Sequence, residues 1–212
     1  MINQNIVGQP AAASNNAILN SRSGQLGDAI VSELHGRYYE TTYRSNSFLL
    51  SVSTAAAVTA FSGGAAGTPM LAIFNPAGSG KNAVLNKVSV GNVVAASGAG
   101  TVSFALWFGA TATITQATTV TPWNMGTQLQ SGSGVTGFRN VALTSSTAAT
   151  NAIALASYYW ATAAGVGLVS NGVFDLEGAV IIPPGSYCAL GGSAALTSAT
   201  WIGSMQWEEV PV

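Results

Sequence analysis

The sequence is short of charge. Lysine and arginine together number 6 and aspartate and glutamate 7, so only 6% of the 212 residues are charged, whereas an ordinary soluble domain has about 25%. An isolated monomer uses charged side chains to stay soluble and to keep the edges of its sheets from pairing. We therefore expect much of this surface to be covered by other copies of the chain or by a partner.

The few charges are also nearly balanced, with a net charge of −1. Nucleic-acid binding requires clustered lysine and arginine, so we expect none. A membrane-spanning helix needs about 20 predominantly apolar residues, and the most apolar stretch, Ile153 to Val169, is interrupted by serine, threonine and glycine. We expect no membrane partner. The first residues lack a basic segment followed by an apolar one, so we also expect no secretory signal and a chain that stays in the cytoplasm where it is made.

Residues that usually carry catalysis or bind metals are scarce. The single cysteine, Cys188, excludes an internal disulfide and a cysteine-rich metal site, and no basic neighbour activates it, so we interpret it as a core residue. The single histidine, His35, lies near Glu33 and Glu40 and could act as a general base. It has no second histidine and no nucleophile beside it, and we interpret it as a hydrogen-bonded interface residue. The sequence predicts no enzyme, no cofactor and no metal.

Two further patterns have both a functional and a structural interpretation. Residues 75–82, Asn-Pro-Ala-Gly-Ser-Gly-Lys-Asn, resemble a phosphate loop, but Asn75 and Asn82 occupy the positions where that motif needs glycine and serine or threonine. We interpret the segment as a turn between two strands. Asp175 and Glu177 share one face of an expected strand, where they could bind a cation. A solvated edge or an intersubunit salt bridge is the interpretation we favour.

From Phe48 onward the sequence is typical of β-strands. Short runs rich in valine, isoleucine, threonine and aromatic residues alternate with clusters of glycine, serine, asparagine and proline. This spacing predicts an all-β protein, a jelly-roll-like β-sandwich over residues 48–212. The expected strands are Phe48–Thr54, Pro69–Asn75, Ala83–Ala95, Thr101–Gly109, Val173–Ile182, Ser186–Gly191 and Ala199–Glu208.

Details of these strands lead to sharper expectations. Strict alternation places Val102, Phe104, Leu106 and Phe108 on one face, which we assign to the core. Imperfect alternation over residues 85–93 predicts a bulge or a strand covered on both faces. Thr111 to Thr150 is either a functional excursion or a set of weak strands. No helix of more than two turns is expected.

Residues 1–47 differ from the rest, and we interpret them as an extended N-terminal arm. The first 20 residues are rich in asparagine, glutamine, alanine and serine, without periodicity. Six of the 13 charges then fall between positions 22 and 44. One interpretation is a short solvated helix or coil. The other is a segment that docks on a partner through arginine and tyrosine side chains, and its candidate contact residues are Arg22, Arg37, Tyr38, Tyr39 and Arg44.

Three phrases of the sequence carry a resemblance to structural proteins of tailed bacteriophages. The first is Phe-Asn-Pro-Ala-Gly-Ser-Gly-Lys-Asn-Ala-Val-Leu-Asn-Lys-Val-Ser-Val at residues 74–90. The second is Gly-Asp-Ala-Ile-Val-Ser-Glu-Leu-His-Gly-Arg-Tyr-Tyr-Glu at residues 27–40, which is similar to openings of virion proteins. The third is Val-Ile-Ile-Pro-Pro-Gly-Ser-Tyr-Cys-Ala-Leu at residues 180–190, which resembles the late hairpin of jelly rolls. Together they cover about a fifth of the chain.

This resemblance implies a virion protein, most like a capsid decoration or cement protein. Such a protein would be a homotrimer on the capsid surface, made in the host bacterial cytoplasm, with its arm on the major capsid protein. The alternative is a tail fibre or spike head, or another tail component, that binds a host receptor. That alternative requires exposed aromatic platforms, whereas we expect the tryptophan and tyrosine side chains concerned to be core residues: Trp107, Trp123, Tyr158, Tyr159, Trp160 and Trp201.

Overall fold

A computed structural model describes most of residues 36–212. The described part excludes residues 53, 56, 58–60, 62–65, 95–96, 98–101, 111–113, 116–118, 131, 140–142, 146–150, 155–170 and 194–197. The chain divides into two compact units, and the boundary falls between Tyr39 and Glu40. The smaller unit is Met1–Tyr39 and the larger is Glu40–Val212. Arg22 and His35 lie outside the described residues. The fold described below is that of residues 40–212.

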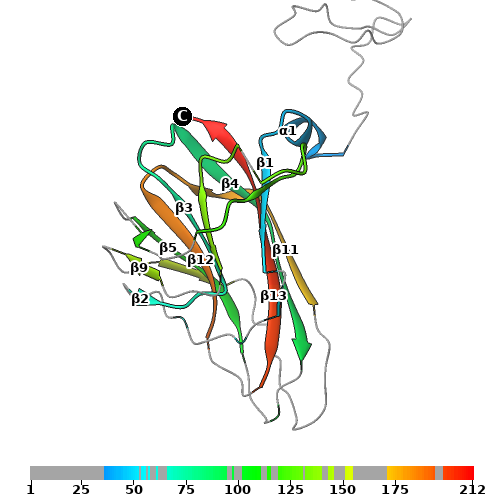
Figure 1. Ribbon diagram of the computed structural model, residues 1–212, viewed down its shortest axis with the longest axis vertical. Coiled ribbons are helices and arrows are strands. Elements are labelled where there is room, and N and C mark those ends of the chain that lie inside the picture. The colour runs from blue at the N-terminus through cyan, green and yellow to red at the C-terminus, as the bar shows by residue number, and fades with distance from the viewer. Residues whose placement is uncertain are drawn as a thin grey trace, which may run out of the picture. The chain divides into compact units, whose positions relative to one another are not determined.

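The larger unit is a sandwich of two antiparallel sheets (Figure 1). The first sheet has the strand order β11-β4-β13-β1-β7 and the second has the order β10-β5-β12-β3-β8. The main strands are β1 (Ser47–Ser51), β3 (Leu71–Asn75), β4 (Lys81–Val94), β5 (Phe104–Ala110), β11 (Asn171–Ile182), β12 (Ser186–Gly192) and β13 (Thr200–Pro211). The seven strands expected from the sequence are therefore confirmed, with ends that differ by a few residues.

Shorter strands complete the two sheets and form a third. They are β2 (Ala66–Gly67), β6 (Ile114–Thr115), β7 (Trp123–Asn124), β8 (Thr136–Arg139), β9 (Leu143–Ser145) and β10 (Asn151–Ala154). A small sheet has the order β2-β9-β6. The described part of residues 111–150 thus contains four strands, each too short to show periodicity. One helix is described, the five-residue α1 (Tyr39–Tyr43), and none of the described residues forms a helix with the length and apolar character needed to cross a membrane.

The connections give a jelly roll. Apart from β7 and β8, which each add to one end of a sheet, β1, β4, β11 and β13 build the first sheet and β3, β5, β10 and β12 build the second. All but one of the links between these eight strands cross from sheet to sheet, and the exception joins β5 to β10. This is the double Greek key of jelly rolls, so the expected fold class is confirmed.

The core lies between the two sheets. It consists of alternating side chains from both inner faces, among them Leu85, Leu106, Leu190 and the two tryptophans Trp201 and Trp207. Val102, Phe104 and Leu106 are buried, and Phe108 packs against the same cluster, as the alternation predicts. The bulge expected in β4 falls at Asn86, because Lys87 pairs with Gln206 and Leu85 with the next residue, Trp207.

A second hydrophobic cluster lies outside the second sheet. Phe61, Phe138 and Tyr187 belong to it, and Trp107 packs against it. Phe61 meets Trp107 edge to face, with ring centroids 6.1 Å apart. Two glycines of the sheet make room for these rings, since a Cβ at Gly109 would lie 2.6 Å from the Tyr187 ring and a Cβ at Gly191 would lie 2.7 Å from Phe61. Both faces of this sheet are therefore packed.

Candidate interaction surface

Three features that the sequence offered as possible chemical sites lie in the described residues: Cys188, the phosphate-loop-like segment and the acidic pair on β11. Cys188 is buried and free, and burial raises the pKa of its thiol well above the ordinary value of 9.0. The phosphate-loop-like segment is a turn between β3 and β4, with Ser79 N–H donating to the Pro76 carbonyl. In the described part of the chain, no group of three or more His, Cys, Asp or Glu side chains could hold a metal ion.

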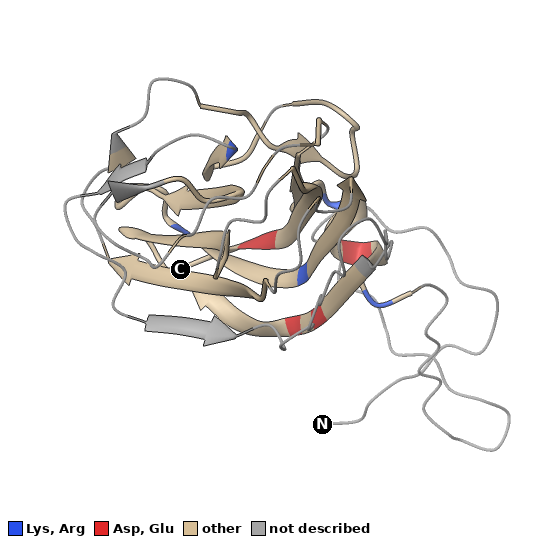
Figure 2. Ribbon diagram, turned by 90° about the horizontal axis from the view of Figure 1, so that it is seen from below, with Lys and Arg blue, Asp and Glu red and all other residues tan. Residues whose placement is uncertain are grey.

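The acidic pair on β11 has an edge position. Among the described strands, β11 stands at the end of its sheet, and Asp175 and Glu177 are both exposed. The Asp175 carboxylate lies 3.7 Å from Lys87 Nζ. The solvated-edge interpretation agrees with this, and the ion pair forms within the chain. Figure 2 shows how thinly charged positions are scattered over the strands.

The candidate contact residues of the arm fall into separate groups. Arg37 belongs to the smaller unit, and its guanidinium lies 5.9 Å from the centre of the Tyr38 ring. Tyr39 is 44% exposed. Arg44 belongs to the larger unit and forms an i, i+4 ion pair with Glu40 along α1. Both members of this pair are more than half exposed, so it contributes little to stability.

A lobe formed by residues 122–130, here called the Asn124 lobe, presents three large apolar side chains to solvent. Trp123 is 45%, Met125 37% and Leu129 61% exposed. The expectation that Trp123 is a core residue is wrong. β7 adds only two residues to the edge of the first sheet, and Trp123 pairs with the half-buried Leu49, whose neighbours Phe48 and Leu50 point into the core.

The backbone of the Asn124 lobe is fixed by one buried side chain. Asn124 Oδ1 accepts hydrogen bonds from the backbone N–H groups of Gly126 and Thr127, at 2.9 and 3.0 Å, while its Nδ2 donates to the Ser45 carbonyl at 2.7 Å. The Met125 N–H also donates to the Ser47 carbonyl. A Cβ at Gly126 would lie 2.2 Å from the Thr42 carbonyl oxygen, so only glycine fits there. The lobe is therefore a fixed structure that holds its apolar side chains outward.

The same end of the sandwich buries a charged group. Glu209 is 2% exposed, and its carboxylate accepts hydrogen bonds from Ser133 Oγ at 2.6 Å, from the Gly134 N–H at 3.0 Å and from Lys81 Nζ at 3.1 Å. Buried charges are stable when they are paired and hydrogen-bonded in this way. Glu209 thereby ties residues 133–134 to the last strand. We assign it a structural role.

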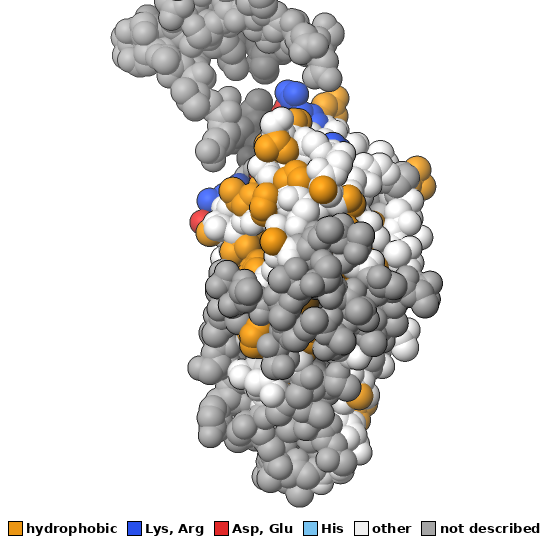
Figure 3. All heavy atoms as spheres, turned by 90° about the vertical axis from the view of Figure 1, so that its left-hand side faces the viewer, with side chains coloured by type: hydrophobic (Ala, Val, Ile, Leu, Met, Phe, Trp, Pro, Cys, Tyr) orange, Lys and Arg blue, Asp and Glu red, His pale blue; other side chains and the backbone are white. Residues whose placement is uncertain are grey.

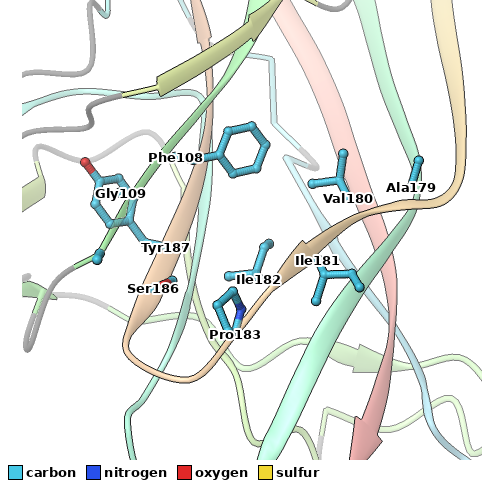
Figure 4. Close-up of a pocket in the computed structure, with 10 residues that line it drawn as sticks. Phe108, Gly109, Ala179, Val180, Ile181, Ile182, Pro183, Ser186 and Tyr187 are labelled. Carbon is cyan, nitrogen blue, oxygen red and sulfur yellow. The ribbon is translucent and has the colours of Figure 1, made fainter.

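A cleft opens between the edges of the two sheets. It encloses about 480 Å³ and is lined by β5, β11 and β12. Figure 4 shows Phe108 and Val180 projecting toward one another in this cleft, whereas Tyr187 points away. None of the lining residues is charged. The cleft is thus the open margin of the core and has no set of acid, base and nucleophile.

Sequence reasoning missed the Asn124 lobe and Glu209. The signal for the lobe was the run Pro-Trp-Asn-Met-Gly, because asparagine two residues before glycine favours a side-chain-capped turn. The signal for Glu209 was strand alternation, since Met205 and Trp207 on the same face of β13 are both buried.

Other exposed apolar residues lie on β4, β11 and β13 and at the C-terminal end, and two of them, Val173 and Ile202, line one hollow. They include Val93, Val94, Val173, Ile181, Ile202, Val210 and Val212. On the face shown in Figure 3, hydrophobic side chains gather in the upper part, and charged atoms stand only at its margins. Among the described residues, the Asn124 lobe alone combines an exposed tryptophan with a hydrogen-bonded scaffold. Comparison of the chain with protein-family models, with curated proteins and with solved structures found no match.

Proposed function

We propose that this chain is a structural component of a tailed-bacteriophage particle, a capsid decoration protein that binds the outer shell and stabilises it. The observation that carries the proposal is the Asn124 lobe on a charge-poor jelly roll. Tryptophan and methionine are enriched at protein interfaces and charged residues are depleted at their centres, and residues 122–130 contain no charged side chain.

The physical effect of such binding is mass action. A protein that binds the assembled shell and not its free subunits shifts the assembly equilibrium toward the shell. A lobe that is already ordered loses little conformational entropy on docking, so more of its contact energy remains as affinity. The partner in this proposal is the major capsid protein. A homotrimer is the assembly we expect, because three copies fit the threefold positions of a shell.

The test is electron cryo-microscopy of particles that carry this chain. Density on the outer shell, with the Asn124 lobe against the major capsid protein, is the expected result. Density only at the tail tip would overturn the decoration role. Density on the shell with the lobe facing solvent would keep the location and reject the interface.

Binding to isolated shells gives a matched mutational test. Trp123→Ser combined with Met125→Ser should lower occupancy in co-sedimentation, while Val93→Ser, which alters a side chain that is 49% exposed at the end of β4, should leave it unchanged. Loss of two anchor side chains at the centre of an interface typically weakens binding by about tenfold or more. Equal occupancy of the two variants would remove the lobe from the interface.

A second candidate function is recognition of a glycan on the host surface, and the exposure of Trp123 favours it. Sugar rings stack on aromatic faces, and the exposed amides of Gln128 and Gln130 are donors and acceptors on the same lobe. Trp201 is buried and Trp107 packs against the outer cluster, so neither is such a platform. Glycan-array binding that Trp123→Ala abolishes would support this function. An array without a specific signal would leave the decoration role as the proposal.

A further inference from the structure

The outer face of the first sheet carries a groove that crosses its strands. Ser51 on β1 pairs with Ser204 on β13, and Ser204 pairs with Ser89 on β4, so these serines stand in one row. All of them line a hollow of about 380 Å³. Their neighbours along the strands are buried, so alternation directs the serine side chains outward. The hydroxyls of Ser89 and Ser204 lie 2.7 Å apart, and the floor of the groove is therefore a row of hydroxyl groups.

Longer side chains form one wall of the groove. They belong to the next row on the same face of the sheet, two residues along each strand from the floor, which is about 6.8 Å away. The members of this row pair in succession across the sheet, in the order Leu49, Gln206, Lys87 and Asp175. Lys87 Nζ lies 3.7 Å from the Asp175 carboxylate. The wall thus offers hydrogen-bond donors and acceptors without a net charge.

Apolar side chains bound the groove on its other side and at one end. Ile202 is 39% exposed and lies two residues from Ser204 along β13. It pairs with Gly91, which has no side chain, so this side of the groove is low over β4. Val173 is 66% exposed, pairs with Ser89 and continues the floor onto β11. The groove therefore combines hydroxyl groups with apolar surface.

We propose that this groove binds a neutral oligosaccharide. A sugar ring carries hydroxyl groups around its edge and apolar C–H groups on its faces. Each serine hydroxyl of the floor offers one donor and two acceptor positions, and the Gln206 amide offers donors and an acceptor. Ile202 and Val173 provide the apolar surface that the C–H groups pack against. Convergent polar groups beside apolar side chains are the usual composition of a ligand site.

The charge and the length of the groove narrow the ligand class. None of the described residues that line the hollow is charged, and the wall pair of Lys87 and Asp175 is balanced. An anionic glycan would require an excess of positive charge. From Ser51 on β1 to Val173 on β11, the floor crosses three strand spacings of about 4.8 Å, or about 14 Å in all. This length suits a chain of linked sugars better than a single one.

This inference deepens the second candidate function and rests on it, because both require a glycan as ligand. It places the ligand differently. Trp123 pairs with Leu49 and so stands at the end of the wall row, whereas Gln128 and Gln130 belong to the Asn124 lobe. The groove and the lobe therefore predict different effects of substitution.

The first test is a glycan array probed with the purified full-length chain. The array carries neutral oligosaccharides of hexoses and N-acetylhexosamines beside sialylated and sulfated ones. A signal on neutral oligosaccharides is the expected result, and titration calorimetry with the neutral oligosaccharide of strongest signal then gives the Kd. An array without a signal on neutral oligosaccharides, or with a preference for the acidic ones, would overturn the proposal.

Ser204→Val tests the floor of the groove. The substitution removes the central hydroxyl and partly fills the groove, while valine is favourable in strands. We expect the Kd for the neutral oligosaccharide to rise by about tenfold or more, because hydrogen bonds and space are lost together. The matched control is Thr136→Val on β8 of the second sheet, which also removes a partly buried hydroxyl and should leave the Kd unchanged. Equal Kd values of the two variants would overturn the groove.

Gln206→Ala is a second variant, and it leaves the buried side chains of the core as they are. It should raise the Kd by about fivefold, because the wall loses one amide. Circular dichroism checks that each variant is folded.

Trp123→Ala separates the groove from the lobe. Weaker binding in Ser204→Val and Gln206→Ala, with binding retained in Trp123→Ala, would support the groove and reject the lobe as the glycan site. Binding that only Trp123→Ala abolishes would keep glycan recognition at the lobe and overturn the groove.

Discussion

The interior between the two sheets and the end of the sandwich that carries the Asn124 lobe are held together by different contacts. The interior is apolar, with Leu85, Leu190 and Trp207 fully buried. At the lobe end, the buried groups that organise the chain are polar, namely Asn124 and Glu209. The Glu209 N–H also donates to the carbonyl of Asn46. This residue lies between Ser45 and Ser47, whose carbonyls accept hydrogen bonds from the Asn124 lobe.

The difference shows how this chain uses its scarce charge. Only nine of its charged residues lie in residues 40–212, and one of them, Glu209, is buried and binds three partner groups. Loops that leave the sandwich have no apolar layer to pack on, so side-chain hydrogen bonds to backbone groups fix them instead. Substitutions in the two regions should therefore differ in size and in how far their effects extend.

The largest effect is expected in the apolar interior. Trp201 is 2% exposed and meets Phe104 edge to face, with ring centroids 5.0 Å apart. Trp201→Ala should lower the free energy of unfolding by about 3–5 kcal/mol, because it leaves a cavity between the sheets. Ile202→Ala, on the next residue and 39% exposed, should change it by no more than about 0.5 kcal/mol. Urea unfolding measures both, and similar values would mean that Trp201 is not packed in solution.

Glu209→Gln should have the next largest effect. The amide retains the shape of the carboxylate, but it removes the charge that Lys81 pairs with and weakens acceptance from Ser133 and Gly134. We expect a loss of about 2 kcal/mol in the free energy of unfolding. The control is Glu208→Gln on the neighbouring, partly exposed residue, which should be nearly neutral. Equal effects of the two would contradict the buried carboxylate site.

Asn124→Ala should cost less and act more locally. It removes the acceptor for two backbone N–H groups and the donor to Ser45, which we expect to cost about 1–2 kcal/mol. Amide hydrogen exchange should accelerate in residues 122–130 and stay unchanged in β4 and β13. The control is Thr127→Ala, which retains the backbone N–H bonded to Asn124. Uniform acceleration across the sandwich would show that the lobe is not an independent unit.

The sequence predicted the interior far better than the lobe end, for a physical reason. Strands such as Thr101–Gly109 are long enough for alternation to mark the buried face. β7 has two residues, and its place depends on hydrogen bonds between residues 45–47 and 124–125, which no periodicity records. The candidates Arg37, Tyr38 and Arg44 rest on a local concentration of charge and on a pair of tyrosines. Among the exposed apolar residues of the lobe, the expectation of a core position concerned Trp123 alone.

The smallest expected effect is the pH dependence of stability that Cys188 causes, and it tests whether the apolar interior excludes water. Cys188 is an ionisable group in the apolar core, and burial raises the pKa of its thiol above 9.0. The unfolded chain therefore releases the thiol proton at lower pH than the folded chain, so this residue's contribution is constant below pH 9.0 and is lost as pH rises above it. Near pH 9.5 the loss should be somewhat under ~1 kcal/mol.

Cys188→Ala isolates this contribution, because the other titrating groups are the same in both chains. Urea unfolding of wild type and variant near neutral pH and near pH 9.5 should give a steeper decline for the wild type. A constant difference between the two chains would reflect only the volume of the lost sulfur, and it would mean that the thiol is accessible to water. The apolar interior and the lobe end would then differ less in polarity than their packing indicates. Both would provide a polar partner for an ionised group.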